Sequence, residues 1–459
     1  MITTFFKKNK ALFSLLLTTA LPIIIQNAIT NFSGLLDNIM VGSLGVNQMN
    51  GVSIANQLFF VLQLCLFGAV SGAGIYTAQF FGTKNNSGIK FTLIYKVISA
   101  TIISFIGMTV LFFFGDSLIS LFISGDGSIE NKSAVAAFGK EYVLIILMGI
   151  IPFGISQAYA STLRENLDTM FPMIASIISV VFNLVFNYLL IFGKLGLPAL
   201  GVKGAAIATS ASRYVETALL IIRLHTNKKY EFARANVKPH VTKNVFAGIV
   251  KTSLMLLCNE FLWSSGMITI NQCYSTCGLD ALSAVSIVSP LSNTLNVVNQ
   301  SIGAAIGILL GQMLGQNKTD EAKSGARSMM ILSLLICIGI AIFSVAISPF
   351  FPKLYNASDE IRLLATYLII IAGCIIPVDA IANASYNTLR SGGKVFLTFM
   401  FDSGFTWLVS VPLAFCLSRF TSITIVPLFI AGNAINILKS AVGVFLVKKG
   451  VWLNNIVNK

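Results

Sequence analysis

Charged side chains are scarce in this chain of 459 residues, where they make up only 10% of the total. Soluble domains average about 25% charged residues, whereas 55% of this chain is hydrophobic and its mean hydropathy is +0.83. These values exclude an ordinary soluble protein and place most of the chain in lipid. The net charge of +14 would suggest a nucleic-acid partner in a soluble protein. In a membrane protein it indicates instead that basic residues favour one side, so no nucleic-acid partner is expected.

Histidine and cysteine are also sparse. Both histidines, His225 and His240, fall in one polar segment, which excludes a histidine relay or a histidine zinc site within the membrane. Seven cysteines lie in apolar surroundings, and Cys273 and Cys277 stand one helical turn apart without a second pair to complete a zinc site. The chain also lacks the motifs GxxxxGK[ST] and HExxH. These absences disfavour an ATP-driven pump and a membrane-embedded enzyme, and no cofactor is expected.

Long apolar runs dominate what remains. A transmembrane helix needs about 20 mostly apolar residues, and this length predicts an all-α membrane protein with twelve spans. The expected spans are residues 11–36, 50–81, 89–114, 137–159, 168–192, 203–224, 245–272, 282–314, 328–350, 363–386, 395–417 and 423–447. The N-terminal segment lacks the small-residue cleavage site of a signal peptide, so we expect it to be retained as a cytoplasmic tail.

The distribution of basic residues distinguishes the two sides of the membrane. With the N-terminus inside, 23 Lys and Arg residues fall on the cytoplasmic side, Lys96 and Lys439 among them, and seven fall on the other side. Arg213 lies within the sixth span. This bias follows the positive-inside rule. We therefore expect a multi-pass protein of the cell membrane with both termini in the cytoplasm.

The chain repeats itself at a constant offset. The segment from Gly45, GVNQMNGVSIANQL, aligns with GLDALSAVSIVSPL from Gly278, and GIYTAQFFG from Gly74 aligns with GILLGQMLG from Gly307, both at an offset of 233 residues. Two parallel six-helix bundles are expected, at 1–230 and 245–459, joined by a cytoplasmic linker at 231–244. Glycines spaced by four in the eighth span, matched by small residues in the second, predict close helix contacts. Such duplicated bundles are typical of secondary transporters.

Three acids stand out inside the spans because no opposite charge lies near them in sequence. They are Asp37, Glu260 and Asp379. An ionisable group in lipid is costly and is a functional candidate by default. A buried carboxyl without a fixed partner either holds a proton or recruits a cation. We therefore interpret these acids as candidate sites of ion coupling.

The other intramembrane charges are interpreted as structural pairs. Arg213 and Glu216 are three residues apart and can meet on one helix face. Asp402 is expected to pair with Lys394 or Arg390, which lie about two and three helical turns before it.

Two asparagines four residues apart, Asn183 and Asn187, share one face of the fifth span. Their amide oxygens suit a hard cation such as Na+. Hydrogen bonding between helices explains the same spacing equally well. The spacing alone leaves both interpretations open.

Several segments together resemble the multidrug and toxic compound extrusion family across nearly the whole chain. They are DNIMVGSLG from Asp37, FNLVFNYLLIFGKLGLPALGVKGAAIATS from Phe182, NEFLWSSG from Asn259 and IIPVDAIANASYNTLRSGG from Ile375. The resemblance, closest to the bacterial NorM-like, sodium-coupled type, implies an antiporter that expels cationic amphipathic drugs in exchange for Na+ or H+. It implies a monomer that contacts membrane lipid. Its cation-coupling residues would be Asp37, Asn183, Asn187, Thr209, Glu260 and Asp379, with Asp37, Asn183 and Asn187 as candidate Na+ ligands.

A flippase or exporter of lipid-linked or other bulky solutes is the alternative with the same two-lobe architecture. Such a protein would need several cationic side chains in its cavity to hold pyrophosphate. Arg213 is the one arginine assigned to the membrane interior, since Arg223 stands at the cytoplasmic end of the sixth span, and acids would repel such a substrate. The sequence therefore favours the antiporter.

Overall fold

The computed structural model describes residues 9–122, 129–234, 236–355, 357–421 and 423–458. Within these ranges the chain is helical and contains no strand, and twelve helices are long and apolar enough to cross a membrane. The predicted all-α class and the twelve spans are thus confirmed. Lys7, Lys8 and Lys459, which were assigned to the cytoplasmic side, lie outside the described residues.

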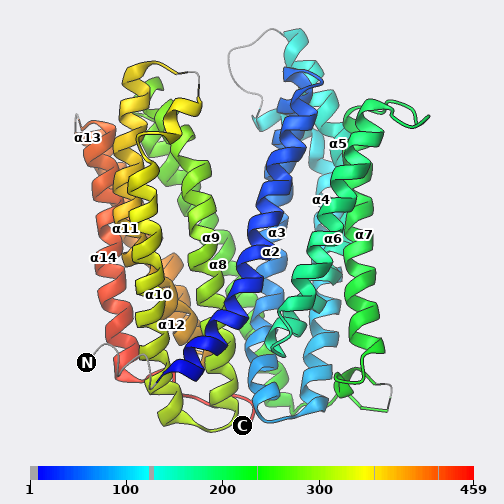
Figure 1. Ribbon diagram of the computed structural model, residues 1–459, viewed down its shortest axis with the longest axis vertical. Coiled ribbons are helices and arrows are strands. Elements are labelled where there is room, and N and C mark those ends of the chain that lie inside the picture. The colour runs from blue at the N-terminus through cyan, green and yellow to red at the C-terminus, as the bar shows by residue number, and fades with distance from the viewer. Residues whose placement is uncertain (1–8, 123–128, 235, 356, 422, 459) are drawn as a thin grey trace. The chain divides into compact units, whose positions relative to one another are not determined.

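Figure 1 shows the order of these helices along the chain. The first half contains α2 (Lys10–Gly42), α3 (Val46–Gly82), α4 (Asn86–Phe122), α5 (Ile129–Glu165), α6 (Met170–Phe192) and α7 (Val202–Thr226). The second half contains α8 (Lys243–Ser275), α9 (Leu279–Gly315), α10 (Thr319–Ile347), α11 (Asp359–Ser391), α12 (Val395–Phe399), the π-helices η3 (Met400–Gly404) and η4 (Thr406–Ser410), α13 (Val411–Phe420) and α14 (Ile425–Lys449). Two short 3₁₀ helices, η1 (Glu231–Ala233) and η2 (Phe351–Leu354), lie in the connections.

Many of these helices are longer than a bilayer requires. The 37 residues of α3, α4, α5 and α9 extend for about 55 Å at 1.5 Å per residue, whereas the hydrocarbon core is about 30 Å thick. Four long helices carry an internal proline, Pro22 in α2, Pro152 in α5, Pro290 in α9 and Pro377 in α11. A proline removes one helical hydrogen bond and favours a bend.

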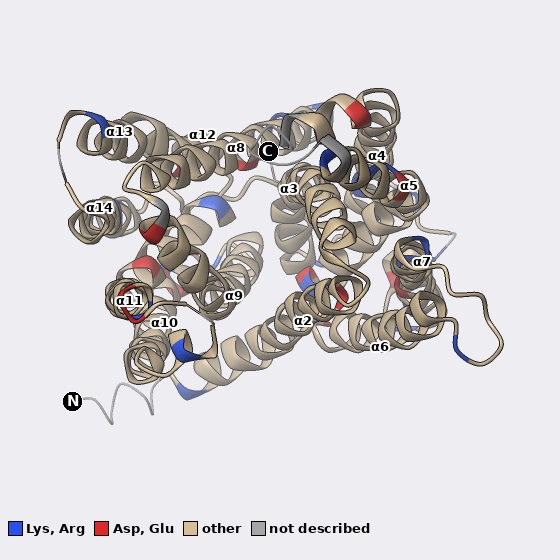
Figure 2. Cartoon of the chain, turned by 90° about the horizontal axis from the view of Figure 1, so that it is seen from above, with Lys and Arg blue, Asp and Glu red and all other residues tan. Residues whose placement is uncertain are grey.

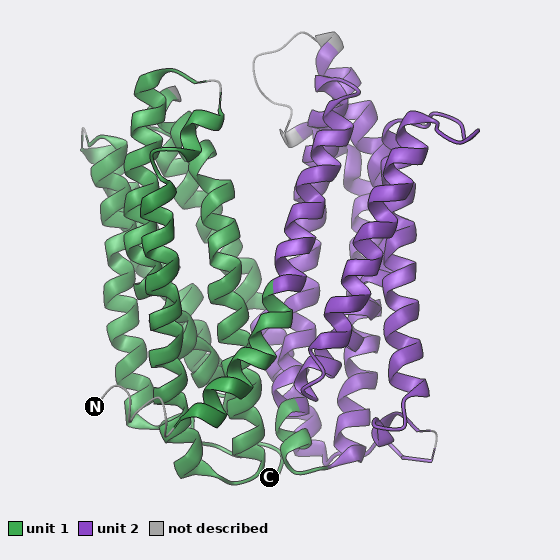
Figure 3. Ribbon diagram, viewed as in Figure 1, with its two compact units in different colours: residues 1–24, 78–84, 258–459 green, residues 25–77, 85–257 purple. Residues whose placement is uncertain are grey.

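The chain forms two compact units, coloured separately in Figure 3. One comprises residues 25–77 and 85–257, and in it α5 packs against α4 and α7, and α7 against α6. The other comprises residues 1–24, 78–84 and 258–459, and in it α11 packs against α9, α10 and α14. Each unit has its own apolar core, with Leu66 and Ile150 central to the first and Leu368 and Leu428 to the second.

The end of α3 and the end of α9 touch through backbone at two equivalent glycines. A Cβ atom on Gly82 would lie 2.3 Å from the carbonyl oxygen of Gln312, and one on Gly315 would lie 2.1 Å from that of Gln79. Both glycines and both glutamines are related by the offset of 233 residues. The close contact predicted from the small residues is thus present, and its reciprocity is what two parallel repeats produce.

The C-terminal segment folds back onto this same contact. Gln79 donates to the carbonyl oxygens of Ser391 at 2.9 Å and Asn454 at 3.2 Å, and accepts from the backbone nitrogen of Ile456 at 2.9 Å. Trp452, in the same C-terminal segment, is fully buried. One glutamine side chain thus pairs with three backbone groups and holds the C-terminal segment in place.

Two lysines counted on the cytoplasmic side lie within long helices and are paired with acids there. Lys96 is fully buried in α4, where it pairs with Glu165 of α5 and donates to Ser161 at 3.1 Å. Lys439 lies inside α14, ten residues before its end. A buried cation is tolerated where an acid and hydroxyl groups replace its water. Figure 2 shows how few residues of the helices are charged.

Candidate functional site

Asp37 of α2 lies against the two asparagines of α6. The amide nitrogen of Asn187 is 2.5 Å from Oδ1 of Asp37, and the same nitrogen is 3.2 Å from Oδ1 of Asn183. The four-residue spacing puts both asparagines on one face of α6, where both are buried. One amide group therefore connects the acid of α2 to the polar pair of α6.

Thr209 of α7 completes this group, as the resemblance implied. The amide nitrogen of Asn183 donates to Oγ1 of Thr209 at 3.2 Å, and Ser33 donates weakly to Oδ1 of Asn183 at 3.5 Å. The hydroxyl of the buried Tyr142 of α5 also interacts with Thr209. Four residues that the sequence named thus form one polar cluster from α2, α6 and α7. Sequence reasoning missed Ser33 and Tyr142, because a single hydroxyl in an apolar helix is a common feature.

The amide oxygen of Asn187 is buried and, within the described part of the chain, accepts no hydrogen bond. A buried acceptor left unpaired is costly and calls for an explanation. Here it belongs to the residue that donates to the carboxylate of Asp37. An amide oxygen beside a carboxylate is the donor set of a hard cation.

The described residues bring no three His, Cys, Asp or Glu side chains together as a metal site. The Asp37 cluster therefore offers one carboxylate together with neutral amide and hydroxyl oxygens. One negative charge balances one monovalent cation or one proton. This donor set does not fit zinc, which favours several sulfur or nitrogen ligands.

Arg213 changes the electrostatic setting of Asp37. It forms the expected ion pair with Glu216, with an N–O distance of 3.5 Å, and its guanidinium carbon lies 4.9 Å from the ring centre of Phe153. The positive charge of Arg213 also interacts electrostatically with the carboxyl group of Asp37. The interpretation of Arg213 and Glu216 as a pair is confirmed. Asp37 lacks an opposite charge along the sequence, but not in space.

Asp402 of η3 pairs with a different partner from the ones expected. Its Oδ1 lies 2.7 Å from Nζ of Lys439, and its Oδ2 lies 3.1 Å from the amide nitrogen of Asn259. The expected partners were Lys394 and Arg390, chosen for their closeness in sequence. Helix packing overrides that closeness, because α14 brings in a lysine 37 residues away. The signal was present, since Lys439 falls inside the predicted span 423–447.

The two other acids of the second half have different charged neighbours. The charges of Arg390 and Asp402 interact electrostatically with the carboxyl group of Glu260. Lys439 interacts electrostatically with Asp379. Lys439 is thus joined to Asp402 by an ion pair and influences Asp379 by its charge.

Asp402 lies on a stretch of π-helix, which no sequence pattern predicted. Residues 400–404 and 406–410 adopt this wider helix, and Ser403 donates to the carbonyl oxygen and to Oδ1 of Asn259, each at 2.8 Å. Such π-helical insertions are rare and often occur at functional sites. They rotate the following residues relative to an α-helix, so the face presented by the eleventh span changes at the acid.

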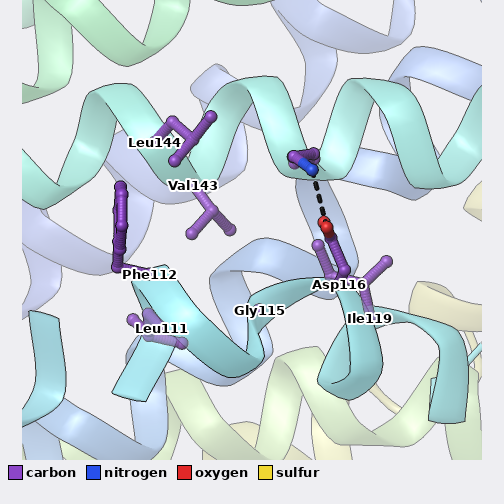
Figure 4. A pocket seen from close by; sticks show the side chains of 8 residues that line it. Leu111, Phe112, Gly115, Asp116, Ile119, Val143 and Leu144 are labelled. Carbon is purple, nitrogen blue, oxygen red and sulfur yellow. Dashed lines mark hydrogen bonds and ion pairs between the residues drawn. The ribbon is translucent and has the colours of Figure 1, made fainter. Parts of the chain in front are cut away.

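A small pocket between α4 and α5 is separate from these clusters (Figure 4). Its lining includes Lys140 and Asp116, whose charged atoms are 2.6 Å apart and whose side chains are 53% and 65% exposed. None of the candidate coupling residues lines it. We therefore assign it no role in substrate binding.

Comparison with known proteins decides the family. The MatE family model matches residues 22–189 and 255–416. The chain belongs to the MatE family. It is 26% identical over 443 residues to a probable multidrug resistance protein NorM of Thermotoga maritima, covering 95% of this chain and 92% of that protein. It is 25% identical to a probable multidrug resistance protein NorM of Oceanobacillus iheyensis, covering 92% of each.

Solved structures confirm the fold of this MatE protein. A crystal structure of a MATE protein in the straight conformation has a TM-score of 0.84 at 17% identity, covering 95% of each chain. A mutant of the Vibrio cholerae MATE transporter VcmN has a TM-score of 0.81 at 17% identity, covering 99% of this chain and all of that one.

Proposed function

We propose that this MatE protein is a secondary active multidrug efflux antiporter. It exports cationic amphipathic compounds in exchange for Na+ or H+ by alternating access. Family membership supports a transporter rather than an enzyme, since solved MATE proteins of the same fold are named as transporters. The names of the NorM relatives support drug-like substrates.

The observation that carries the coupling role is the unpaired amide oxygen of Asn187 beside the carboxylate of Asp37. A cation at this position would be held by the Asp37 carboxylate and the Asn187 oxygen, with Asn183 and Thr209 fixing the orientation of Asn187. A proton on Asp37 would neutralise the same charge. Either event removes the negative charge that attracts a cationic drug.

Arg213 sets how strongly Asp37 holds its cation. The positive charge of Arg213 interacts electrostatically with Asp37, and Arg213 also forms an ion pair with Glu216. A nearby like charge weakens the binding of any cation. The ion bound at Asp37 therefore leaves more readily, which favours turnover over tight binding.

Exchange follows from this competition. Coupling requires only that the drug and the ion differ in their affinity for the inward- and outward-open states. In the outward-open state the ion takes Asp37 and the drug leaves. In the inward-open state the ion leaves and the carboxylate is free to attract the next drug cation.

Glu260 and Asp379 form the acidic region of the second half and favour Na+ as the coupling ion. The protein functions as a monomer among the lipids of the cell membrane, with both termini in the cytoplasm. The excess of basic residues on that side supports this orientation, and it persists without Lys96 and Lys439.

The decisive variant is Asp37→Asn, with Asp116→Asn as its control, because Asp116 is an exposed acid in an ion pair remote in sequence from the cluster. We expect Asp37→Asn to abolish drug resistance in cells while its membrane insertion and yield match those of the control. Efflux at the wild-type level from Asp37→Asn would remove Asp37 from the coupling mechanism.

A further inference from the structure

Lys439 is a cation inside a membrane-spanning helix, and its side chain is only 16% exposed. Its ammonium nitrogen lies 2.7 Å from Oδ1 of Asp402 and 5.5 Å from the ring centre of Phe401. Desolvating a lysine to this extent is costly. A purely structural role could be filled by an apolar residue at lower cost.

A second acid, Asp379, adjoins the contact between α14 and α11 next to this lysine. Ser440, next to Lys439 on α14, donates to the carbonyl oxygen of Val378 on α11 at 2.7 Å, and Val378 precedes Asp379. The charge of Lys439 also interacts electrostatically with Asp379. The flexible four-carbon side chain of Lys439 thus starts beside Asp402 and next to the helix contact that adjoins Asp379.

The formal charges around Lys439 do not cancel. Glu260, Asp379 and Asp402 supply three negative charges, whereas Arg390 and Lys439 supply two positive ones. Counted as ionised, these five side chains sum to one negative charge, which one monovalent cation would balance.

The first half has the same kind of feature. Its sixth span, α7, carries Arg213, which pairs with Glu216 and acts on Asp37. The sixth span of the second half, α14, carries Lys439 beside Asp402 and Asp379. Each half thus places one covalently attached cation next to the acids that the proposed function uses.

We propose that Lys439 is a tethered competitor of the monovalent cation bound in the second half. With a cation at Asp379, the ammonium group pairs with Asp402, as observed. When that cation leaves, Lys439 turns toward Asp379 and lowers its attraction for the next one. Lys439 is thus a positioning residue that limits the affinity of the acids and speeds release. This inference rests on the proposed function, because it concerns the same acids.

Four variants of the full-length protein test the competition. Lys439→Gln removes the competitor, and Lys439→Arg retains its charge. Asp402→Asn removes the acid that holds Lys439 and so releases it toward Asp379. Lys448→Gln, an exposed lysine in the last turn of the same helix, removes an equal charge at the helix end. The measurement is equilibrium binding of radioactive Na+ and of tetraphenylphosphonium, a monovalent organic cation, to purified protein.

We expect Lys439→Gln and Asp402→Asn to shift the affinity for the probes in opposite directions. Lys439→Gln binds both probes about tenfold more tightly and releases them more slowly, and Asp402→Asn binds them about tenfold more weakly, as expected for one added or removed charge at close range. Lys439→Arg and Lys448→Gln stay within about twofold of wild type. If the ion pair only stabilised the fold, Lys439→Gln and Asp402→Asn would change the affinity for the probes in the same direction.

Two results would overturn the proposal, and they are distinguishable. Wild-type protein that binds the probes, with Lys439→Gln and Asp402→Asn shifted in the same direction or unchanged, contradicts the competitor role alone. Wild-type protein that binds neither probe contradicts the proposed function as well. If Lys439→Gln does not insert into the membrane, wild-type affinity in Asp402→Asn is sufficient to refute the competition.

Discussion

The amide nitrogen of Asn187 lies 2.5 Å from Oδ1 of Asp37, while the amide oxygen of the same residue is buried and unpaired within the described chain. One side chain therefore both restrains the acid and offers a free ligand beside it. The proposed cation site rests on this relationship. The predictions below test it and the parts of the fold that support it.

Asn187→Leu keeps the approximate size of the side chain and removes both polar groups. We expect the cation concentration for half-maximal efflux to rise about tenfold or more, since a hydrogen bond to a charged group contributes about 1.5–3 kcal/mol. The measurement is drug efflux from proteoliposomes as a function of the coupling cation. Val185→Leu, an exposed apolar position on the same helix, is the control. An unchanged cation dependence in Asn187→Leu would reduce this asparagine to a structural role.

Glu260→Gln and Asp379→Asn test the acidic region of the second half. Each removes one negative charge from the cluster that contains Lys439. We expect impaired sodium-dependent efflux in both variants, seen as a lower maximal rate or a higher sodium requirement. Asp359→Asn alters a side chain that is 97% exposed at the start of α11 and should leave efflux unchanged. Sodium dependence at the wild-type level in both variants would leave Glu260 and Asp379 without a coupling role.

Gly392→Ala should loosen the C-terminal segment. A Cβ atom there would lie 1.7 Å from the carbonyl oxygen of Trp452, so the backbone of the segment must shift. Overpacking of this kind costs about 1–3 kcal/mol. We expect a lower thermal unfolding midpoint in detergent, whereas Gly34→Ala, where no atom lies within 4 Å, should not lower it. Equal midpoints for the two variants would mean that the segment is not held as described.

Tyr230 provides a pH-dependent test outside the membrane. It is buried in the connection after α7 and donates to Asp168, which also accepts from Arg223 at 3.4 Å. Burial above all, and then Asp168, raise the pKa of the Tyr230 hydroxyl above its ordinary value of 10.0. A raised pKa means that the neutral phenol is favoured in the folded state. Its contribution to stability is therefore complete below pH 10 and is lost as the pH rises above that value.

The corresponding variant is Tyr230→Phe, which removes the hydroxyl and little else. We expect it to unfold at a lower temperature than wild type by the same margin from pH 6 to pH 9. The margin should narrow above pH 10. A margin that changes between pH 6 and pH 9 would show that another group titrates with this contact.

The sequence predicted the spans and the repeat because both depend on local composition. Apolar runs of sufficient length identify helices in lipid, and the constant offset of 233 residues relates Gly82 to Gly315, which the structure brings into reciprocal contacts. The grouping of Asp37 with Asn183, Asn187 and Thr209 came from the family resemblance. Spacing along α6 alone could not have located the acid of α2.

The error concerned a charge whose partner is distant in sequence. Asp402 was expected to pair with Lys394 or Arg390, and no acid was assigned to Lys96 or Lys439. Their acids, Glu165 and Asp402, are 69 and 37 residues away. Only the packing of helices reveals such pairs. The π-helix at Asp402 had no sequence signal either, because its residues are ordinary for a membrane helix.

The coupling of drug efflux to a cation gradient is tested most directly in proteoliposomes with separately imposed sodium and proton gradients. The chain should drive drug transport when the sodium gradient is imposed in the exchange direction, and Asp37→Asn should abolish that transport. A response to the proton gradient alone would identify H+ as the coupling ion. Transport that ignores both gradients, or that persists at the wild-type rate in Asp37→Asn, would contradict a cation-coupled antiporter centred on Asp37.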